Sequence, residues 1–255
     1  ASSGIGLELV KHLAVLSPTT KLVLSSRRED ELEKIVEELK LDRDRCLILP
    51  LDLEYHGDLF KSKVDLVLDR FDHIDILINN AGISQRSLIK DTQYSVDQRL
   101  MSINYLGTVT LSKSVLEHFI AQKHGHFVVV SSVSGYVGTP SRSTYAASKH
   151  ALHGFFDALR FEHEKDNIHV TVICPGYIRT KISENAFSGD GKLHQKLDPQ
   201  TERGTQADVC ALKMLYAISY KKHEYYVGRM SSIAIYAQRF LPTIFYQIVR
   251  RMDTV

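Results

Sequence analysis

Short apolar runs typical of buried strands alternate along this chain with amphipathic stretches typical of helices. Strands that read as nearly continuous apolar runs are usually covered on both faces, so the alternation predicts a parallel sheet between two layers of helices. We therefore expect an α/β fold with a three-layer, doubly wound, Rossmann-type sheet, whose ligands bind beyond the carboxyl ends of the strands. The predicted strands cover residues 21–26, 46–51, 74–78, 126–130, 168–174 and 224–227, and the predicted helices cover residues 7–16, 29–40, 58–71, 94–122, 145–165 and 205–220.

The length and composition fit one domain with a large core. The chain has 255 residues and no linker-like shift in composition, so we expect a single domain over residues 1–255. Its 32 basic and 30 acidic residues nearly balance, which gives no reason to expect nucleic acid as a partner. Cys46, Cys174 and Cys210 are widely spaced, so neither a disulfide framework nor a zinc site is predicted, and no metal is expected. Cys174 lies in the apolar run 170–174, which favours a buried, inert thiol.

Tyr145 and Lys149 are four residues apart in a predicted helix and share one face of it. A protonated Lys149 would lower the pKa of the Tyr145 phenol, which could then exchange a proton near neutral pH. Taken alone, this spacing is more often found on a solvated helix face. Ser132, thirteen residues upstream, and Asn104 favour a catalytic pair, although a turn could also use the serine and a kinked helix the asparagine.

Two segments near the start of the chain predict a nucleotide cofactor. The first is the stretch Ser2, Ser3, Gly4, Ile5 and Gly6, which leads into a predicted helix. Its glycines allow a pyrophosphate to approach the backbone, and the free N–H groups of the helix N-terminus can bind it. An ordinary helix cap would have a similar sequence. Arg27 and Arg28 follow the first predicted strand with no carboxylate before them. Arginine there accommodates a 2′-phosphate, so we favour NADPH over NADH. The alternative is a solvated pair that Glu29 and Asp30 neutralise.

Small and polar residues close the next two predicted strands. Asp52 and Leu53 are placed to contact adenine, and Asn80, Ala81 and Gly82 allow a cofactor to pack against the backbone. A plain turn would also use asparagine and glycine.

The combined motifs resemble those of the short-chain dehydrogenase/reductase (SDR) family over essentially the whole chain. Within it, segments 84–88, 104–109 and 150–156 resemble the branch called dehydrogenase/reductase SDR-family member seven, near the 11β-hydroxysteroid dehydrogenases. The Thr-Gly that normally opens the glycine motif is absent, so we expect the natural protein to extend upstream and to include a first strand. The matching motifs are residues 2–6, 79–82, 104, 131–132, 145–149 and 175–176.

The resemblance implies a catalytic set of Asn104, Ser132, Tyr145 and Lys149. Tyr145 would be the general acid in reduction, Ser132 would hold the substrate oxygen, and Lys149 would lower the pKa of Tyr145 and bind the nicotinamide ribose. Asn104 would fix a water next to Lys149. The resemblance also places cofactor contacts at Pro175, Gly176, Ile178 and Thr180.

The same resemblance implies an NADP(H)-dependent carbonyl reductase, or the reverse dehydrogenase. Sibling enzymes suggest a hydrophobic substrate such as a steroid, retinoid or xenobiotic ketone. They also suggest a homodimer. The expected location is the endoplasmic reticulum membrane, through an upstream anchor, and the cytoplasm is the other possibility. A catalytically silent NADP(H)-binding regulatory or scaffold protein is the alternative. A sugar-nucleotide epimerase shares the Tyr-Lys pair but typically needs a larger substrate domain.

A hydrophobic C-terminal segment, 231–252, is unusual for a soluble enzyme. Its apolar run 233–249 is interrupted by Arg239 and Pro242 and followed by two arginines, so it is too interrupted to span a bilayer. The pattern suits a pair of helices lying at a membrane surface, and packing on the core or on a neighbouring subunit is the alternative.

Overall fold

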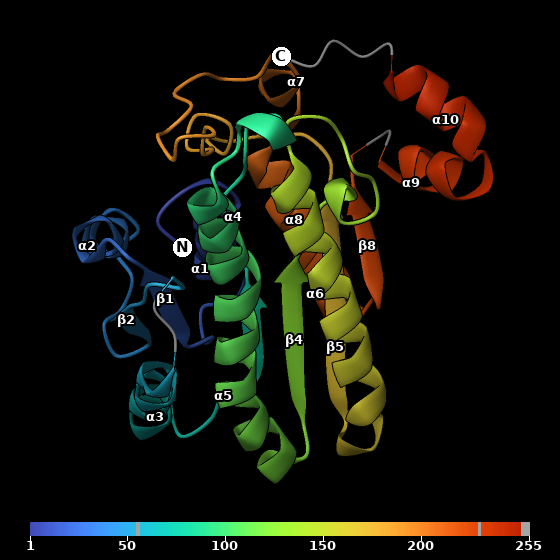
Figure 1. The fold of residues 1–255 in the computed structure, drawn as a ribbon. Coiled ribbons are helices and arrows are strands. Elements are labelled where there is room, and N and C mark those ends of the chain that lie inside the picture. The colour runs from blue at the N-terminus through green and yellow to red at the C-terminus, as the bar shows by residue number, and fades with distance from the viewer. Residues whose placement is uncertain (55–56, 229–230, 251–255) are drawn as a thin grey trace.

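Parallel strands and covering helices form the molecule, in a computed structural model that describes residues 1–54, 57–228 and 231–250. One sheet pairs β1 (Leu22–Ser26) with β2 (Cys46–Pro50). A larger sheet runs in the order β3 (Ile76–Asn79), β4 (Gly125–Val130), β5 (Ile168–Pro175) and β8 (Glu224–Val227), all parallel. Helices lie on both faces (Figure 1), so the doubly wound α/β fold is confirmed. The strand expected upstream of Ala1 and the single-domain assignment stay predictions.

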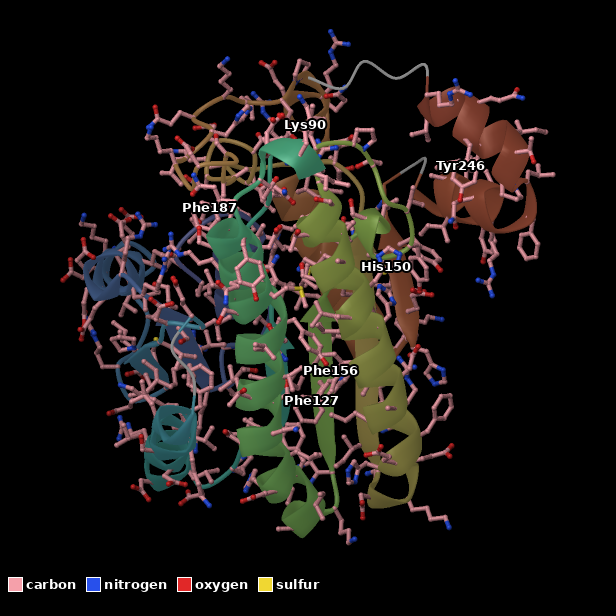
Figure 2. All side chains as sticks on the ribbon, in the orientation of Figure 1. Lys90, Phe127, His150, Phe156, Phe187 and Tyr246 are labelled. Carbon is pink, nitrogen blue, oxygen red and sulfur yellow. The ribbon has the colours of Figure 1, made fainter. Side chains whose placement is uncertain are left out.

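Successive side chains of β4 point to opposite faces of the sheet and are buried against the helices on each face. Phe127 and Val129 pack with α3 (Asp58–Phe71), α5 (Thr108–Gln122) and α6 (Ser143–Glu162). Figure 2 shows Phe127 and Phe156 between the sheet and α6. Val128 and Val130 pack on the other side with α1 (Gly4–Leu16) and α8 (Ala207–Ser219), while α2 (Glu29–Glu38) covers β1 and β2. Each such side chain contributes about 1.5–3 kcal/mol when fully buried, and this burial fixes the register of the sheet.

The predicted helix 94–122 is divided into three parts. It contains α4 (Tyr94–Met101), a π-helical segment η2 (Ser102–Gly107) and α5. A Cβ on Gly107 would lie 2.2 Å from the Leu53 carbonyl oxygen, so only glycine permits this close approach. A π-turn widens the helix locally, and here it carries the fully buried Asn104.

Two predicted boundaries differ from the observed ones for identifiable reasons. The third strand starts at Ile76 and not at residue 74, because the Ile74 N–H donates to His118 Nε2 and its carbonyl accepts from Gln122 Nε2. Thr205 and Gln206 form β7 (Thr205–Gln206) with β6 (Ile178–Arg179), so the helix predicted from residue 205 begins two residues later. Shorter helical turns complete the structure: η1 (Ile89–Asp91), η3 (Val133–Gly135), η4 (Glu164–Asp166) and α7 (Pro199–Glu202).

The C-terminal segment forms two helices, α9 (Ser231–Phe240) and α10 (Pro242–Val249), which lie beside the top of β8 (Figure 1). Ile235 and Phe245 pack against Val137, while several larger apolar side chains remain exposed. Residues 251 and 252 of the predicted segment lie outside the described residues. Within the described ranges, no helix combines the length and the hydrophobicity needed to cross a bilayer.

Candidate active site

A cleft of about 1750 Å³ opens beyond the carboxyl ends of the strands, where the fold predicts a ligand. Two predicted site residues do not line it: Gly6 lies behind the α1 terminus, and Asn104 is buried behind Gly82. The structure brings the other predicted catalytic and cofactor groups to this one cleft. The predicted residues on its walls are Ser2, Ser3, Gly4, Ile5, Arg27, Arg28, Asp52, Leu53, Asn80, Ala81, Gly82, Ser132, Tyr145, Lys149, Pro175, Gly176, Ile178 and Thr180.

Tyr145 lies in the first turn of α6 with its side chain almost completely buried. Burial raises the pKa of the Tyr145 phenol, and a hydrogen bond with Ser132 and the charges of Arg142 and Arg86 act in the opposite direction. The phenol therefore carries its proton at neutral pH and can donate it.

Lys149 follows one turn later on the same face of α6. Its Nζ lies 5.9 Å from the centre of the Tyr145 ring and donates a 2.8 Å hydrogen bond to the Val130 carbonyl. Burial lowers the pKa of Lys149 to about 8. In this structure the groups that favour the Tyr145 phenolate are Ser132 and the two arginines, so the predicted effect of Lys149 on that phenol stays a prediction.

Ser132 ends the segment that follows β4 and begins η3. Its Oγ accepts a hydrogen bond from the Ser134 amide at 3.1 Å and lies 3.5 Å from the Pro175 carbonyl oxygen. Ser132 therefore stabilises a turn, which is the alternative role that the sequence also allowed. The hydrogen bond with Tyr145 places the same hydroxyl beside the phenol.

Asn104 holds the backbone of Ile83 from both sides. Its Oδ1 accepts from the Ile83 N–H and its Nδ2 donates to the Ile83 carbonyl, each at 2.9 Å, and Nδ2 also donates to Ser148 Oγ at 3.0 Å. A Cβ on Gly82 would lie 3.3 Å from both Asn104 Oδ1 and Lys149 Nζ. The three residues converge, which explains why a glycine closes this strand.

The beginning of the chain offers a suitable cradle for an anionic cofactor. Gly4 has a φ of +56°, a left-handed conformation that favours glycine, and a Cβ there would lie 3.3 Å from Thr180 Cγ2. The Ser3 side chain makes no capping hydrogen bond to α1, so the first N–H groups of this helix are available to a phosphate. A Cβ on Gly6 would lie 2.9 Å from Asn80 Nδ2, which keeps α1 close to the end of β3. These residues fit a dinucleotide.

Arg27 and Arg28 are exposed on the cleft wall at the end of β1. Neither forms an ion pair within residues 1–54, 57–228 and 231–250. The alternative interpretation, in which Glu29 and Asp30 pair with these arginines, is therefore not what the structure shows. Asp52 accepts a hydrogen bond from the Glu54 amide at 3.0 Å, a turn that positions Leu53 at the cleft.

A buried ion-pair cluster beside Tyr145 was not predicted. Arg86 forms two hydrogen bonds with Asp198 through Nε, at 3.2 and 3.0 Å, and Arg142 donates to Asp198 Oδ2 at 3.1 Å. Burial opposes ionisation of Asp198, but the two arginines keep the pKa of its carboxyl below the ordinary value. The cluster joins the segment after β3, the start of α6 and the loop before α7. Its members are up to 112 residues apart, so no local signal identified it.

A family model described as short chain dehydrogenase matches residues 1–191. The chain is 39% identical over 254 residues to "Dehydrogenase/reductase SDR family member 7B" of Mus musculus, which covers 98% of this chain and 78% of the mouse protein.

Two solved structures share the fold. A short-chain dehydrogenase/reductase of Burkholderia phymatum in complex with NAD superposes with a TM-score of 0.79 at 20% identity, covering 100% of this chain and 94% of that one. A gluconate 5-dehydrogenase of Burkholderia cenocepacia J2315 in complex with NADP and tartrate has a TM-score of 0.77 at 21% identity, covering 91% and 92%.

Proposed function

The chain belongs to the short-chain dehydrogenase family, and from this premise we propose that it is an NADPH-dependent reductase of hydrophobic carbonyl compounds, or the reverse alcohol dehydrogenase. One observation carries the proposal: Tyr145, Lys149 and Ser132 converge in a cleft whose other end has an anion-binding helix terminus. The family relationship supports an oxidoreductase, and the cofactor and substrate choices below are finer inferences.

Tyr145 acts as the proton donor in the direction of reduction. Because burial keeps its phenol protonated, Tyr145 gives its proton to the carbonyl oxygen as that oxygen gains electron density. Ser132 donates a hydrogen bond to the same oxygen and holds it near the phenol. When bound, the nicotinamide supplies the hydride that adds to the carbonyl carbon.

Lys149 and Asn104 assist this proton transfer without donating the proton themselves. Lys149 binds the nicotinamide ribose hydroxyls through its ammonium, and its charge favours the Tyr145 phenolate left after proton transfer. Asn104 positions the Ile83 backbone and borders Lys149 at Gly82, the place where a water could pass protons towards solvent. A regulatory protein without turnover would have little physical need for this buried polar set.

NADP(H) is preferred because of Arg27 and Arg28. Of the two solved structures described above, one is an NADP complex and the other an NAD complex, so fold similarity does not choose between the cofactors. Two guanidinium groups that have no carboxylate partner among the described residues match a 2′-phosphate, whereas an NAD site would place an acidic residue there. The first N–H groups of α1 hold the pyrophosphate, and Pro175, Gly176, Ile178 and Thr180 contact the nicotinamide half.

The substrate end of the cleft supports a hydrophobic ketone, aldehyde or alcohol. Apolar groups from the loop after β6 and from the C-terminal helices line it, and Tyr177 adds an aromatic face. A steroid, retinoid or xenobiotic ketone has this chemistry. The apolar wall is formed by Val137, Phe187, Ile233, Ala237, Phe245 and Ile248.

The test is cofactor oxidation by the purified protein with a panel of hydrophobic ketones and aldehydes, using NADPH and NADH in parallel. We expect turnover with NADPH and a loss of kcat by roughly 100-fold or more in Tyr145→Phe, with NADPH affinity unchanged. Tight NADPH binding without turnover on any carbonyl would instead favour the regulatory alternative. An Arg27→Glu and Arg28→Glu double variant should weaken NADPH binding and leave NADH binding nearly unchanged.

The exposed apolar surface of α9 and α10 supports contact with a membrane surface next to the substrate entrance. Phe240 is 72% exposed and Ile244 55% exposed, and Arg239 and Arg250 provide basic groups at the helix ends. A homodimer through the α5 and α6 layer and an endoplasmic reticulum location are further proposals that rest on the family resemblance.

A further inference from the structure

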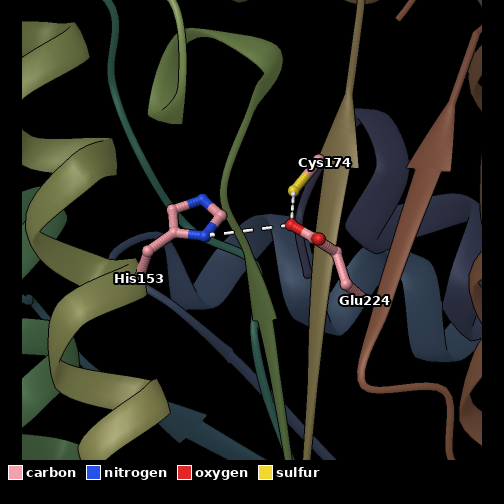
Figure 3. A group of neighbouring side chains, drawn as sticks. All are labelled: His153, Cys174 and Glu224. Carbon is pink, nitrogen blue, oxygen red and sulfur yellow. Dashed lines mark hydrogen bonds and ion pairs between the residues drawn. The ribbon is translucent and has the colours of Figure 1, made fainter. Parts of the chain in front are cut away.

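Three side chains of different chemistry meet below the cleft: His153 from α6, Cys174 from β5 and Glu224 from β8 (Figure 3). Their ligand atoms lie within 4.8 Å of one another, and Glu224 Oε1 is 3.4 Å from Cys174 Sγ and 3.9 Å from His153 Nδ1. In a tetrahedral zinc site with bonds of about 2.0–2.3 Å, ligand atoms are about 3.3–3.7 Å apart. Shifts of less than about 1 Å would bring the three atoms to that geometry.

The hydrogen bonds of Ser131 define which nitrogen of His153 faces the cluster. Ser131 Oγ donates to the Lys149 carbonyl at 3.3 Å, so it accepts from His153 Nε2–H at 2.8 Å. With Nε2 carrying the proton that Ser131 accepts, the neutral imidazole presents the lone pair of Nδ1 to the cluster. Across the part of the chain that the structure describes, no group donates a hydrogen bond to that nitrogen. A lone pair facing a carboxylate oxygen is an arrangement that a cation stabilises.

The remaining contacts of Glu224 resemble the outer partners of a metal ligand. Tyr226 donates a 2.7 Å hydrogen bond to Oε2, which orients the carboxylate and leaves Oε1 towards Cys174 and His153. The Tyr136 hydroxyl donates a hydrogen bond to Oε1 and holds that oxygen in place. Metal-bound histidines and carboxylates usually carry such second hydrogen bonds, because these fix the tautomer and the orientation.

Cys174 differs from the other buried cysteines in its surroundings. Its thiol donates a 3.4 Å hydrogen bond to Glu224 Oε1 and therefore faces a polar group. Cys210 is equally buried but packs among apolar side chains. A metal ion would displace the proton of Cys174 to solvent and bind the thiolate.

We propose that His153 Nδ1, Cys174 Sγ and Glu224 Oε1 bind one zinc ion. A set of imidazole, thiolate and carboxylate suits Zn²⁺ better than Mg²⁺ or Ca²⁺, which take oxygen ligands. The ion joins α6, which carries Tyr145 and Lys149, to β5 just before Pro175 and to β8. Its role is structural, and the proposal does not depend on the redox function.

The experiment measures metal binding directly on the purified protein after dialysis against zinc. Wild type should retain one equivalent of zinc, and cobalt substitution should give thiolate-to-cobalt charge-transfer absorption. Cys174→Ser should abolish that absorption, and both Cys174→Ser and Glu224→Gln should weaken zinc binding by at least about tenfold. Cys210→Ser is the matched control, since it removes a buried thiol outside the cluster and should leave binding unchanged.

Stability provides a second readout that does not require activity. With free zinc near a hundred times Kd, the Tm of the wild type should rise by roughly 5–10 °C, and that of Cys174→Ser should not. Circular dichroism establishes that each variant is folded. The proposal is overturned if the wild type binds less than one equivalent, if its cobalt form lacks the thiolate absorption, or if Cys174→Ser keeps that absorption.

Discussion

Gln85 and Tyr145 are 60 residues apart in the sequence, yet Gln85 Oε1 accepts a hydrogen bond from the Tyr145 backbone amide at 3.4 Å. The same oxygen accepts from the Thr144 amide at 3.0 Å. Arg142, the residue at the N-cap of α6, makes no side-chain cap of its own. The fully buried Gln85 therefore satisfies the first turn of the helix from outside it and fixes the position of the tyrosine.

Gln85→Leu should lower both stability and activity. It leaves two amide groups of α6 without a partner, so the free energy of unfolding should fall by about 2 kcal/mol and Tm by roughly 5 °C. A displaced Tyr145 should lower kcat roughly tenfold in the reductase assay. Gln85→Glu is the control: a carboxylate still accepts these bonds and is favoured at a helix N-terminus, so kcat should stay within about threefold. Equal kcat values in Gln85→Leu and wild type would refute the capping role.

The proposed reductase activity should fall as pH rises above about 8. The pKa of Lys149 is lowered to about 8 by burial, so its charge is present below that pH and lost above it. Because kcat/KM for NADPH reports the free enzyme, its alkaline limb should have a midpoint near this value. Between about pH 8 and 10.5, Lys149 is protonated to a greater extent in the unfolded chain than in the folded protein. This residue therefore makes the free energy of unfolding rise with pH in that window. Lys149→Arg stays charged and should remove the alkaline limb; a limb that persists there would assign it to another group.

Asp198→Asn should destabilise the protein strongly. It leaves Arg86 and Arg142 without their shared carboxylate in a buried cluster, and removing one partner of such a pair costs about 3–5 kcal/mol. Asp190→Asn in the same loop is the matched control, because Asp190 pairs with Lys192 at the surface and its loss should cost at most about 0.5 kcal/mol. Urea denaturation measures both. Similar midpoints for the two variants would show that the cluster does not hold the loop.

The paired substitutions Phe240→Ser and Ile244→Ser should abolish binding to anionic lipid vesicles without unfolding the protein. Both side chains are exposed, and each contributes about 1.5–3 kcal/mol when buried in an apolar phase, so partitioning should fall by about 100-fold or more. Phe161→Ser is the control, since Phe161 is 75% exposed on α6, outside the C-terminal helices. Vesicle co-sedimentation with unchanged NADPH binding measures the effect. Equal co-sedimentation of the double variant and wild type would argue for packing on another subunit.

The local features of the site could be predicted, because they depend on residues close in sequence. The apolar runs of β4 and β5 indicated buried parallel strands, and the spacing of Tyr145 and Lys149 placed both on one helix face. The burial of Cys174 also followed from its apolar neighbours, and it is confirmed. Its contact with His153 and Glu224 could not be inferred, because zinc motifs are recognised by ligand spacing and Glu224 lies 50 residues away on another strand.

The sequence by itself determined the alternation of strands and helices, the family, and the residues predicted to be catalytic, because periodicity and motif spacing are properties of short stretches of chain. Only the tertiary structure decided which distant groups meet those residues. The cap of Gln85 on α6, the clamp of Asn104 on Ile83 and the pairing of Asp198 with two arginines each join segments that the sheet topology brings together. Such contacts depend on where strand ends and helix termini are packed, and no local pattern encodes that.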